Sequence, residues 1–158
     1  MKKLFIILAV LFCFGINAYG AGTVVEVPAW LNAETMTFTV TFTCTADAAA
    51  ATYPATAFSA ATTTALKGWH LYRVRINPGA VAPTANYDLT ITEQGGDVLG
   101  GAGLNLSATA TEFRAPAVAS VGTSYGIGEV TMADTWTLTL ENNAVNSAVT
   151  VITLFFTK

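Results

Sequence analysis

The sequence predicts an all-β protein, an antiparallel β-sandwich of the jelly-roll or Ig-like kind, built as a single domain over residues 21–158. Two observations predict this fold class. Several segments alternate apolar side chains with threonine or another polar residue, which is the pattern of a strand with one buried and one solvated face. Runs rich in glycine, proline, asparagine and serine separate these segments and favour turns, whereas the helical period of about 3.6 residues does not recur.

Residues 1–20 have the pattern of a secretory signal peptide. Two lysines follow the initial methionine, residues 4–16 are apolar, and Ala18 and Gly20 supply the small residues of a cleavage site after Gly20. The alternative is a retained membrane anchor, but the apolar run is shorter than the roughly 18–20 residues that span a bilayer. We therefore expect an exported protein, periplasmic or extracellular, with no membrane segment after cleavage.

The first two strands are expected at residues 23–27, ahead of Pro28, and at residues 36–45. The second alternates at every step, so one face carries apolar side chains and the other carries only threonine. Threonine suits the solvated face because its branched Cβ fits a pleated surface and its hydroxyl tolerates water. The inward residues of this strand are expected to be Met36, Phe38, Val40, Phe42 and Cys44.

Four further strands are expected at residues 69–77, 87–92, 136–140 and 148–157. In the first of these, Tyr72, Val74 and Ile76 should face inward, with the arginines between them on the other face. The last two segments flank a turn-forming NNAVNS sequence, which predicts a hairpin. Residues 148–157 are apolar on both faces, so we expect a core face and a second face covered by a loop or a partner chain.

Two segments do not alternate. Residues 48–66 are rich in alanine and threonine; alanine tolerates a helix, but Pro54 and the threonine run disfavour one, so an irregular segment with an edge strand is expected. Residues 95–128 should form loops with short strands. Within this part of the chain, glycines 95–103 lack the lysine and the helix of a phosphate-binding loop and are expected to serve turns with positive φ.

The net charge, the single histidine and the cysteine restrict the classes of function that the sequence can support. Residues 21–158 hold five Lys and Arg against ten Asp and Glu, which argues against nucleic acid and gives no basic patch for an anionic membrane. His70 is the only histidine, and it lies within an expected strand. Cys44 has no partner for a disulfide after cleavage, so a buried thiol is expected, the alternatives being an intermolecular disulfide or a nucleophile.

No spacing of residues suggests a catalytic, metal or cofactor site, so a protein that is not an enzyme is expected. The residues expected to make surface contacts are aromatic, because exposed aromatic rings provide stacking platforms and interface anchors. They are Trp30, Trp69, Tyr125 and Phe156.

Residues 69–103 contain the elements NPG at 77–79, APT at 82–84, NYD at 86–88 and DVLGG at 97–101. In physical terms, proline and glycine after Asn77 predict a turn in which Gly79 takes the left-handed position. In this order and spacing, the elements resemble small virion-associated β-proteins of tailed bacteriophages. The resemblance implies a small structural β-protein, located in the virion if phage-encoded.

The leading functional expectation is a non-catalytic, exported structural or surface-interaction protein, such as a phage-like virion or particle-assembly component. Its partners would be further copies of itself or another surface or particle protein. The alternatives are a carbohydrate- or surface-binding β-sandwich module, for which a glycan is the expected ligand, and a fimbrial-type subunit.

Overall fold

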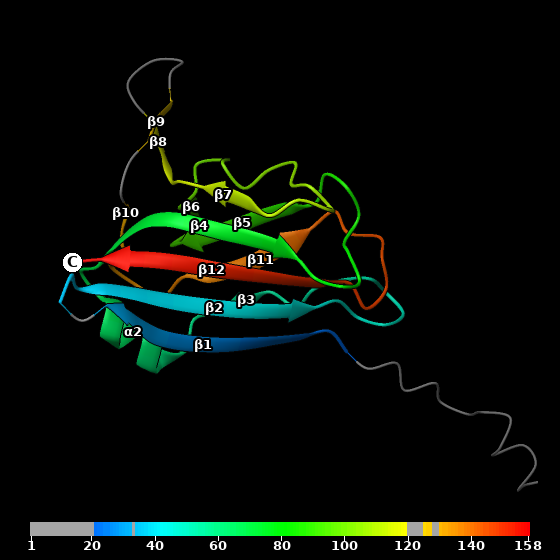
Figure 1. Ribbon diagram of the computed structural model, residues 1–158, viewed down its shortest axis with the longest axis horizontal. Coiled ribbons are helices and arrows are strands. Elements are labelled where there is room, and N and C mark those ends of the chain that lie inside the picture. The colour runs from blue at the N-terminus through cyan, green and yellow to red at the C-terminus, as the bar shows by residue number, and fades with distance from the viewer. Residues whose placement is uncertain (1–20, 33, 120–124, 128–129) are drawn as a thin grey trace, which may run out of the picture.

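Two antiparallel β-sheets form the framework of the fold, as expected for an all-β protein (Figure 1). The computed structural model describes residues 21–32, 34–119, 125–127 and 130–158. The expected signal peptide lies outside these residues. No helix within the described ranges has the length and apolar character needed to cross a membrane.

The first sheet has six strands, in the order β1-β2-β12-β4-β10, with β7 also paired to β4. The central strand is therefore β12, which lies between β2 and β4. The strand bounds are β1 (Thr23–Asn32), β2 (Thr37–Thr45), β12 (Val149–Thr157), β4 (His70–Pro78), β10 (Val130–Thr131) and β7 (Glu112–Arg114).

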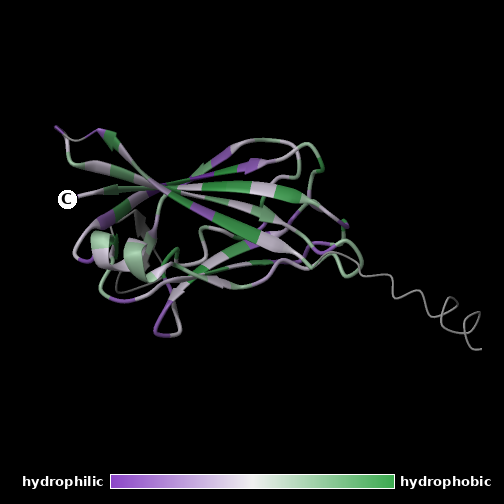
Figure 2. Ribbon diagram, turned by 90° about the horizontal axis from the view of Figure 1, so that it is seen from below, coloured by the Kyte–Doolittle hydropathy of each residue, from purple (hydrophilic) through white to green (hydrophobic). Residues whose placement is uncertain are grey.

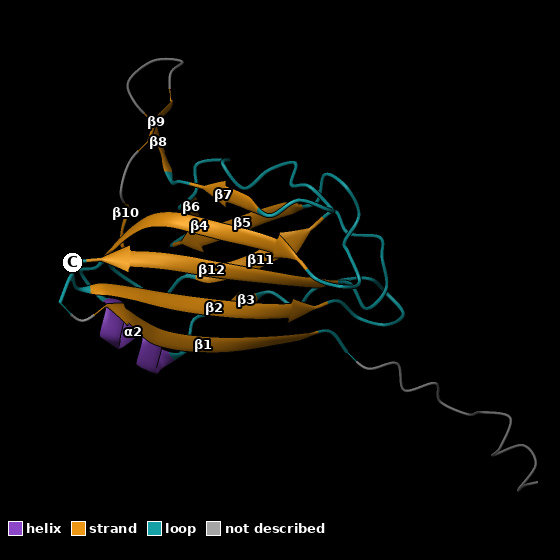
Figure 3. Ribbon diagram, in the orientation of Figure 1, coloured by secondary structure: helices purple, strands orange, loops and turns teal. Residues whose placement is uncertain are grey.

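The second sheet has four strands in the order β3-β11-β5-β6, and a separate two-stranded pair joins β8 to β9 (Figure 3). One short helix, α2, lies beside β1 in Figure 3. The bounds are β3 (Thr56–Ala57), β11 (Thr137–Glu141), β5 (Asp88–Glu93), β6 (Gly96–Asp97), β8 (Ala117–Ala119), β9 (Tyr125–Ile127) and α2 (Ala60–Leu66).

The core lies between the two sheets. Trp136, next to β11, packs against Phe156 of β12 with ring centroids 5.7 Å apart, which brings side chains of the two sheets into contact. The expected inward residues of β2 from Phe38 to Cys44 are buried, and the same alternation of burial holds in β5 and β11. Figure 2 shows hydrophobic and hydrophilic residues following one another along the strands. Met36 is the exception: it is 43% exposed and has a positive φ of 50°, because the chain is turning there before β2 begins.

The expected hairpin between residues 136–140 and 148–157 does not exist. β11 pairs with β3 and β5 in one sheet, whereas β12 pairs with β2 and β4 in the other. The connecting residues therefore cross from one sheet to the other. Asn143 fixes this crossing, because its Nδ2 donates to the carbonyl of Ala51 at 2.6 Å and its Oδ1 accepts from the backbone N–H of Thr84 at 3.1 Å.

β4 contains an irregularity that changes which face Tyr72 occupies. The register with β12 shifts between Phe155 and Phe156, so that Arg73 lies opposite Phe155 and Leu71 opposite Phe156. Leu71 is fully buried, while Tyr72 is only half-buried and packs against Phe155 with centroids 6.3 Å apart. The expected inward position of Tyr72 is therefore wrong, since one extra residue in a strand reverses the alternation.

Residues 48–66 contain the expected edge strand, β3, but also the helix α2. The helix begins well after Pro54, so the proline does not interrupt it. Ser59 caps its N-terminus, because the Ser59 side chain accepts a hydrogen bond from the N–H of Thr62. Glu26 of β1 in turn accepts hydrogen bonds from the backbone N–H and the hydroxyl of Ser59, at 2.8 and 3.1 Å. A side chain distant in sequence thus stabilises this short helix.

β1 is longer than expected and runs through Pro28, which pairs with Val40 of β2. A proline has no N–H to donate to a neighbouring strand, so it is tolerated in an edge strand when its nitrogen faces away from that neighbour.

The NPG turn also differs from expectation. Gly79 is not in the left-handed region; a Cβ there would lie 2.7 Å from the Cβ of Val149, so glycine is needed for close approach of β12.

Candidate interaction surface

The outer face of the six-stranded sheet is formed by the residues that point away from the core. One row across it consists of Val27, Thr41, Thr153, Arg75 and Phe113, which are paired in register from β1 to β7. Thr153 accepts hydrogen bonds from the Thr41 hydroxyl at 3.4 Å and from Arg75 Nη2 at 3.2 Å. Side-chain hydrogen bonds therefore connect the outward threonine of β2 to Arg75 of β4 through Thr153 of β12.

Arg73 lies beside this row and covers aromatic rings. Its guanidinium carbon is 4.3 Å from the ring centroid of Phe155, 5.3 Å from that of Phe113 and 5.9 Å from that of Tyr72. Such contacts are attractive because the face of an aromatic ring carries negative charge. Phe155 is only 8% exposed although it is on the outer face. Arg73 and Tyr72 of the neighbouring strand contact Phe155, so side chains of β4 cover part of the face of β12 for which a loop or a partner chain is expected.

A shallow groove of about 310 Å³ lies at one end of this face and is lined by Thr35, Thr37, Tyr72 and Thr157. The hydroxyls of Thr35 and Thr37 are 2.9 Å apart. The groove thus combines threonine hydroxyls with a half-buried tyrosine next to Arg73.

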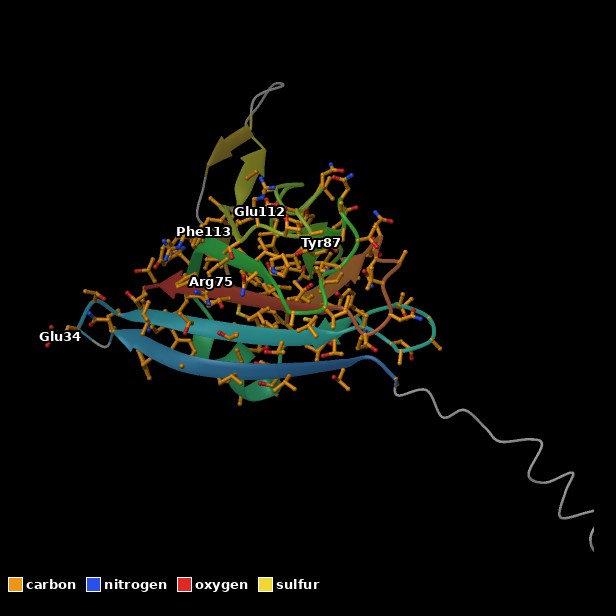
Figure 4. All side chains as sticks on the ribbon, turned by 45° about the vertical axis from the view of Figure 1, so that its right-hand side comes forward. Glu34, Arg75, Tyr87, Glu112 and Phe113 are labelled. Carbon is orange, nitrogen blue, oxygen red and sulfur yellow. The ribbon has the colours of Figure 1, made fainter. Side chains whose placement is uncertain are left out.

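The charges of the two sheets differ. In the strands of the six-stranded sheet, the carboxylates belong to Glu26, which binds Ser59, and to Glu112, which pairs with Arg114 on the core-facing side of β7. Figure 4 shows Glu112 and Phe113 on the β7 side of Arg75. The outer face therefore carries Arg73 and Arg75 without a carboxylate in its strands.

The four-stranded sheet carries acidic residues instead. Asp88 lies directly opposite Glu141, and a hydrogen bond from Asn105 N–H to Asp88 Oδ1 at 2.7 Å offsets part of their repulsion. Asp134, at the end of this sheet, has a lowered pKa because the backbone N–H of Thr135 donates to its carboxylate. The molecule is therefore positive on one outer face and negative on the other.

Exposed apolar side chains gather on the hairpin of β1 and β2. Of the large apolar side chains that are exposed within the described part of the chain, most belong to this hairpin; the others are Val81, Leu104 and Phe113. Figure 4 shows Glu34 at the tip of the hairpin. The apolar hairpin is defined by Val25, Val27, Trp30, Leu31 and Met36, which are 43–58% exposed.

The residues expected to make surface contacts have different locations. Trp30 is 57% exposed and stands at the open end of an aromatic cluster, with its ring 5.2 Å from Phe38 and 5.5 Å from Trp69. Trp69 is 5% exposed and Phe156 is fully buried, so neither provides a surface platform, because both point between the sheets. The backbone of Tyr125 belongs to β9, and its side chain lies outside the described part of the structure.

Sequence reasoning missed Tyr72, Arg73 and Phe113. Tyr72 was assigned to the core because the irregularity in β4 cannot be read from alternation. Phe113 occurs in a glycine- and alanine-rich stretch that gives no strand signal, and it is 59% exposed. The pair of arginines separated by one residue was the available signal, since Arg73 and Arg75 had to share the outward face.

Cys44 is buried, and His70 contacts a threonine of the neighbouring strand. Burial raises the pKa of the Cys44 thiol from 9.0 to about 12, which disfavours the reactive thiolate. His70 Nδ1 lies 2.9 Å from the hydroxyl of Thr131 on the neighbouring strand. Within the described ranges, no three His, Cys, Asp or Glu side chains are grouped as metal ligands.

A second cavity, of about 360 Å³, lies where the loops after β2 and β11 meet, and Tyr53, Glu141 and Asn143 contribute to its lining. The amide of Asn143 is already used by the backbone groups that it holds together. We therefore assign this cavity a structural role.

Comparison of the chain with protein-family models, with curated proteins and with solved structures found no match.

Proposed function

We propose that this chain is a non-catalytic, exported structural protein with a jelly-roll fold, and that it acts by associating with further copies of itself in a phage-like virion or other particle. The apolar hairpin is the observation that carries this proposal. Large apolar side chains concentrated on one exposed element are typical of protein interaction sites.

The order of strand pairing supports the jelly-roll assignment. β2 pairs with β12, β3 with β11, β4 with β7 and β5 with β6. Each pair is nested inside the previous one along the chain, as when a long antiparallel ribbon is folded over into two sheets. Jelly rolls of this kind occur in viral capsid and lectin domains. The likeness of residues 69–103 to phage virion proteins supports the same functional class.

The geometry of β1 favours contact through side chains over the addition of a strand. Pro28 offers no N–H at the free edge, and both a proline and a charged residue at an edge oppose strand addition. The only carboxylate of β1, Glu26, is held by Ser59, so no unpaired acidic group of this strand opposes a second apolar hairpin. A two-fold contact through the outer face of the hairpin would then bury Val25 and Val27, which lie opposite Thr43 and Thr41, from both chains.

Light scattering coupled to size-exclusion chromatography of the mature full chain tests this proposal over a range of concentrations. We expect oligomers that dissociate on dilution, and a monomer when Val25 and Val27, which share the outer face of β1, are both replaced by serine. The matched control is Leu104→Ser, which removes an exposed apolar side chain of the loop between β6 and β7, outside the hairpin. A wild-type protein that stays monomeric at high concentration, or an oligomer unchanged by the double substitution, would contradict the proposal.

A further inference from the structure

The groove between Thr35, Thr37, Tyr72 and Thr157 has the chemical character of a saccharide site. Threonine hydroxyls both donate and accept hydrogen bonds, as sugar hydroxyls do. The half-buried ring of Tyr72 offers an apolar surface with a polar tip beside them. The hydroxyls of Thr35 and Thr37 share one hydrogen bond, and each keeps further donor or acceptor capacity that an apolar ligand could not use.

Arg73 adds a charge requirement. Its guanidinium carbon lies 4.3–5.9 Å from the ring centroids of Phe155, Phe113 and Tyr72, and these aromatic contacts hold the group in place without accepting the conventional hydrogen bonds that its N–H groups can donate to a ligand. The sole ion pair within the described ranges joins Arg114 to Glu112, so no described carboxylate neutralises Arg73. A planar guanidinium pairs best with a carboxylate or a phosphate through two parallel hydrogen bonds.

The overall charge of the chain indicates which of these two anionic groups, carboxylate or phosphate, suits this surface better. The chain has a net charge of −3, and the outer face has only two arginines, so a densely charged phosphate polymer would be repelled by most of the surface. A saccharide with one carboxylate per ring places its charge more sparsely. It also supplies hydroxyls that can use the remaining hydrogen-bonding capacity of the threonines.

We propose that this groove binds a carboxylate-bearing saccharide, which stacks on Tyr72, exchanges hydrogen bonds with the threonine hydroxyls and pairs its carboxylate with Arg73. This binding goes beyond the proposed self-association, because it depends on Tyr72 and Arg73 of β4 and not on the apolar hairpin. The two proposals can therefore fail separately: the chain could associate without binding a saccharide, or bind a saccharide without associating.

Calorimetric titration of the mature full chain with tri-galacturonic acid tests the proposal, with the neutral galactose trimer of the same linkage as the comparison ligand. We expect the acidic trimer to bind about tenfold more tightly or better, since a hydrogen-bonded charge pair contributes about that factor. Arg73→Gln should remove this preference, and raising the salt concentration should weaken it.

Arg75→Gln is the matched control, because Arg75 is engaged with Thr153. It should keep the preference for the acidic trimer. Thermal unfolding of both variants shows whether each remains folded, and Arg73→Lys provides a second test, since it keeps the charge but loses the two-pronged hydrogen bond. Equal binding of the two trimers, binding of neither, or equally tight binding of tripolyphosphate would overturn the proposal.

Discussion

β12 and β1 are both apolar on their two faces, yet β12 is almost entirely buried and β1 almost entirely exposed. The difference follows from their places in one sheet. β12 lies between β2 and β4, with the second sheet on its core side and Arg73 on its outer side, whereas β1 has a neighbour on one edge only. Two strands with similar hydrophobic patterns therefore differ in exposure. The central strand contributes its apolar side chains to the core, whereas the edge strand leaves them available for interaction.

The largest difference between the two strands should appear when an aromatic side chain is removed from each. Phe156→Ala in β12 should lower the free energy of unfolding by about 3–5 kcal/mol, because it leaves a cavity beside Trp136. Trp30→Ala in β1 should cost about 1 kcal/mol, since more than half of that side chain is already in solvent. Urea denaturation measures both, and equal losses would break the comparison.

A pH-dependent effect should come from Cys44, which lies opposite Thr150 of β12. Burial raises the pKa of this thiol to about 12, so in alkaline solution the unfolded chain loses the proton first. The free energy of unfolding is therefore unaffected by this thiol below about pH 9. It declines by about 1.4 kcal/mol per pH unit as the pH rises from there toward 12.

Cys44→Ala should remove this decline between about pH 9 and 10. Burial also raises the pKa of Tyr87 from 10.0 to about 12, so Tyr87 adds a decline of the same sign only above pH 10. Urea midpoints at pH 8, 9 and 10 for wild type and variant provide the measurement. A parallel pH dependence in the two proteins would show that Cys44 is not shielded.

A smaller effect should distinguish two threonines of β2, the strand between β12 and β1. The Thr39 hydroxyl donates to the carbonyl of Ala29 in β1 at 3.3 Å, so Thr39→Ala should cost about 0.5–1.5 kcal/mol. Thr43 is half-exposed, and Thr43→Ala should cost less than about 0.5 kcal/mol. Equal costs, again from urea midpoints, would mean that the hydroxyl bond to β1 contributes nothing.

The smallest effect on stability is expected at the exposed face of β1. Val27→Ser should change the free energy of unfolding by less than about 0.5 kcal/mol, because Val27 is 53% exposed. A loss as large as that of Phe156→Ala would indicate that β1 is covered in solution. The measurement is therefore made at low protein concentration, where self-association does not contribute.

Alternation predicted the strands and most of their inward residues, from Phe38 in β2 to Leu140 in β11, because burial of one face is a local property of the sequence. It could not predict that residues 136–140 and 148–157 belong to different sheets, since pairing depends on segments far apart in the chain. The N-cap of helix α2, Ser59, is held by Glu26, which lies 33 positions earlier in the sequence. The candidate groove was missed for the same reason: the irregularity in β4 that turns Tyr72 outward arises from pairing with β12.

The nested pairing of strands also has a consequence for how the chain reaches its folded state. β12 comes last among the strands in the order of synthesis, yet β2 and β4 meet only through it. Until it emerges, both strands have an open hydrogen-bonding edge and no common neighbour. Folding must therefore wait for contacts between distant parts of the chain, which makes it slow. A nascent chain that stays unfolded until its last strand arrives would remain competent for threading through a narrow translocation channel.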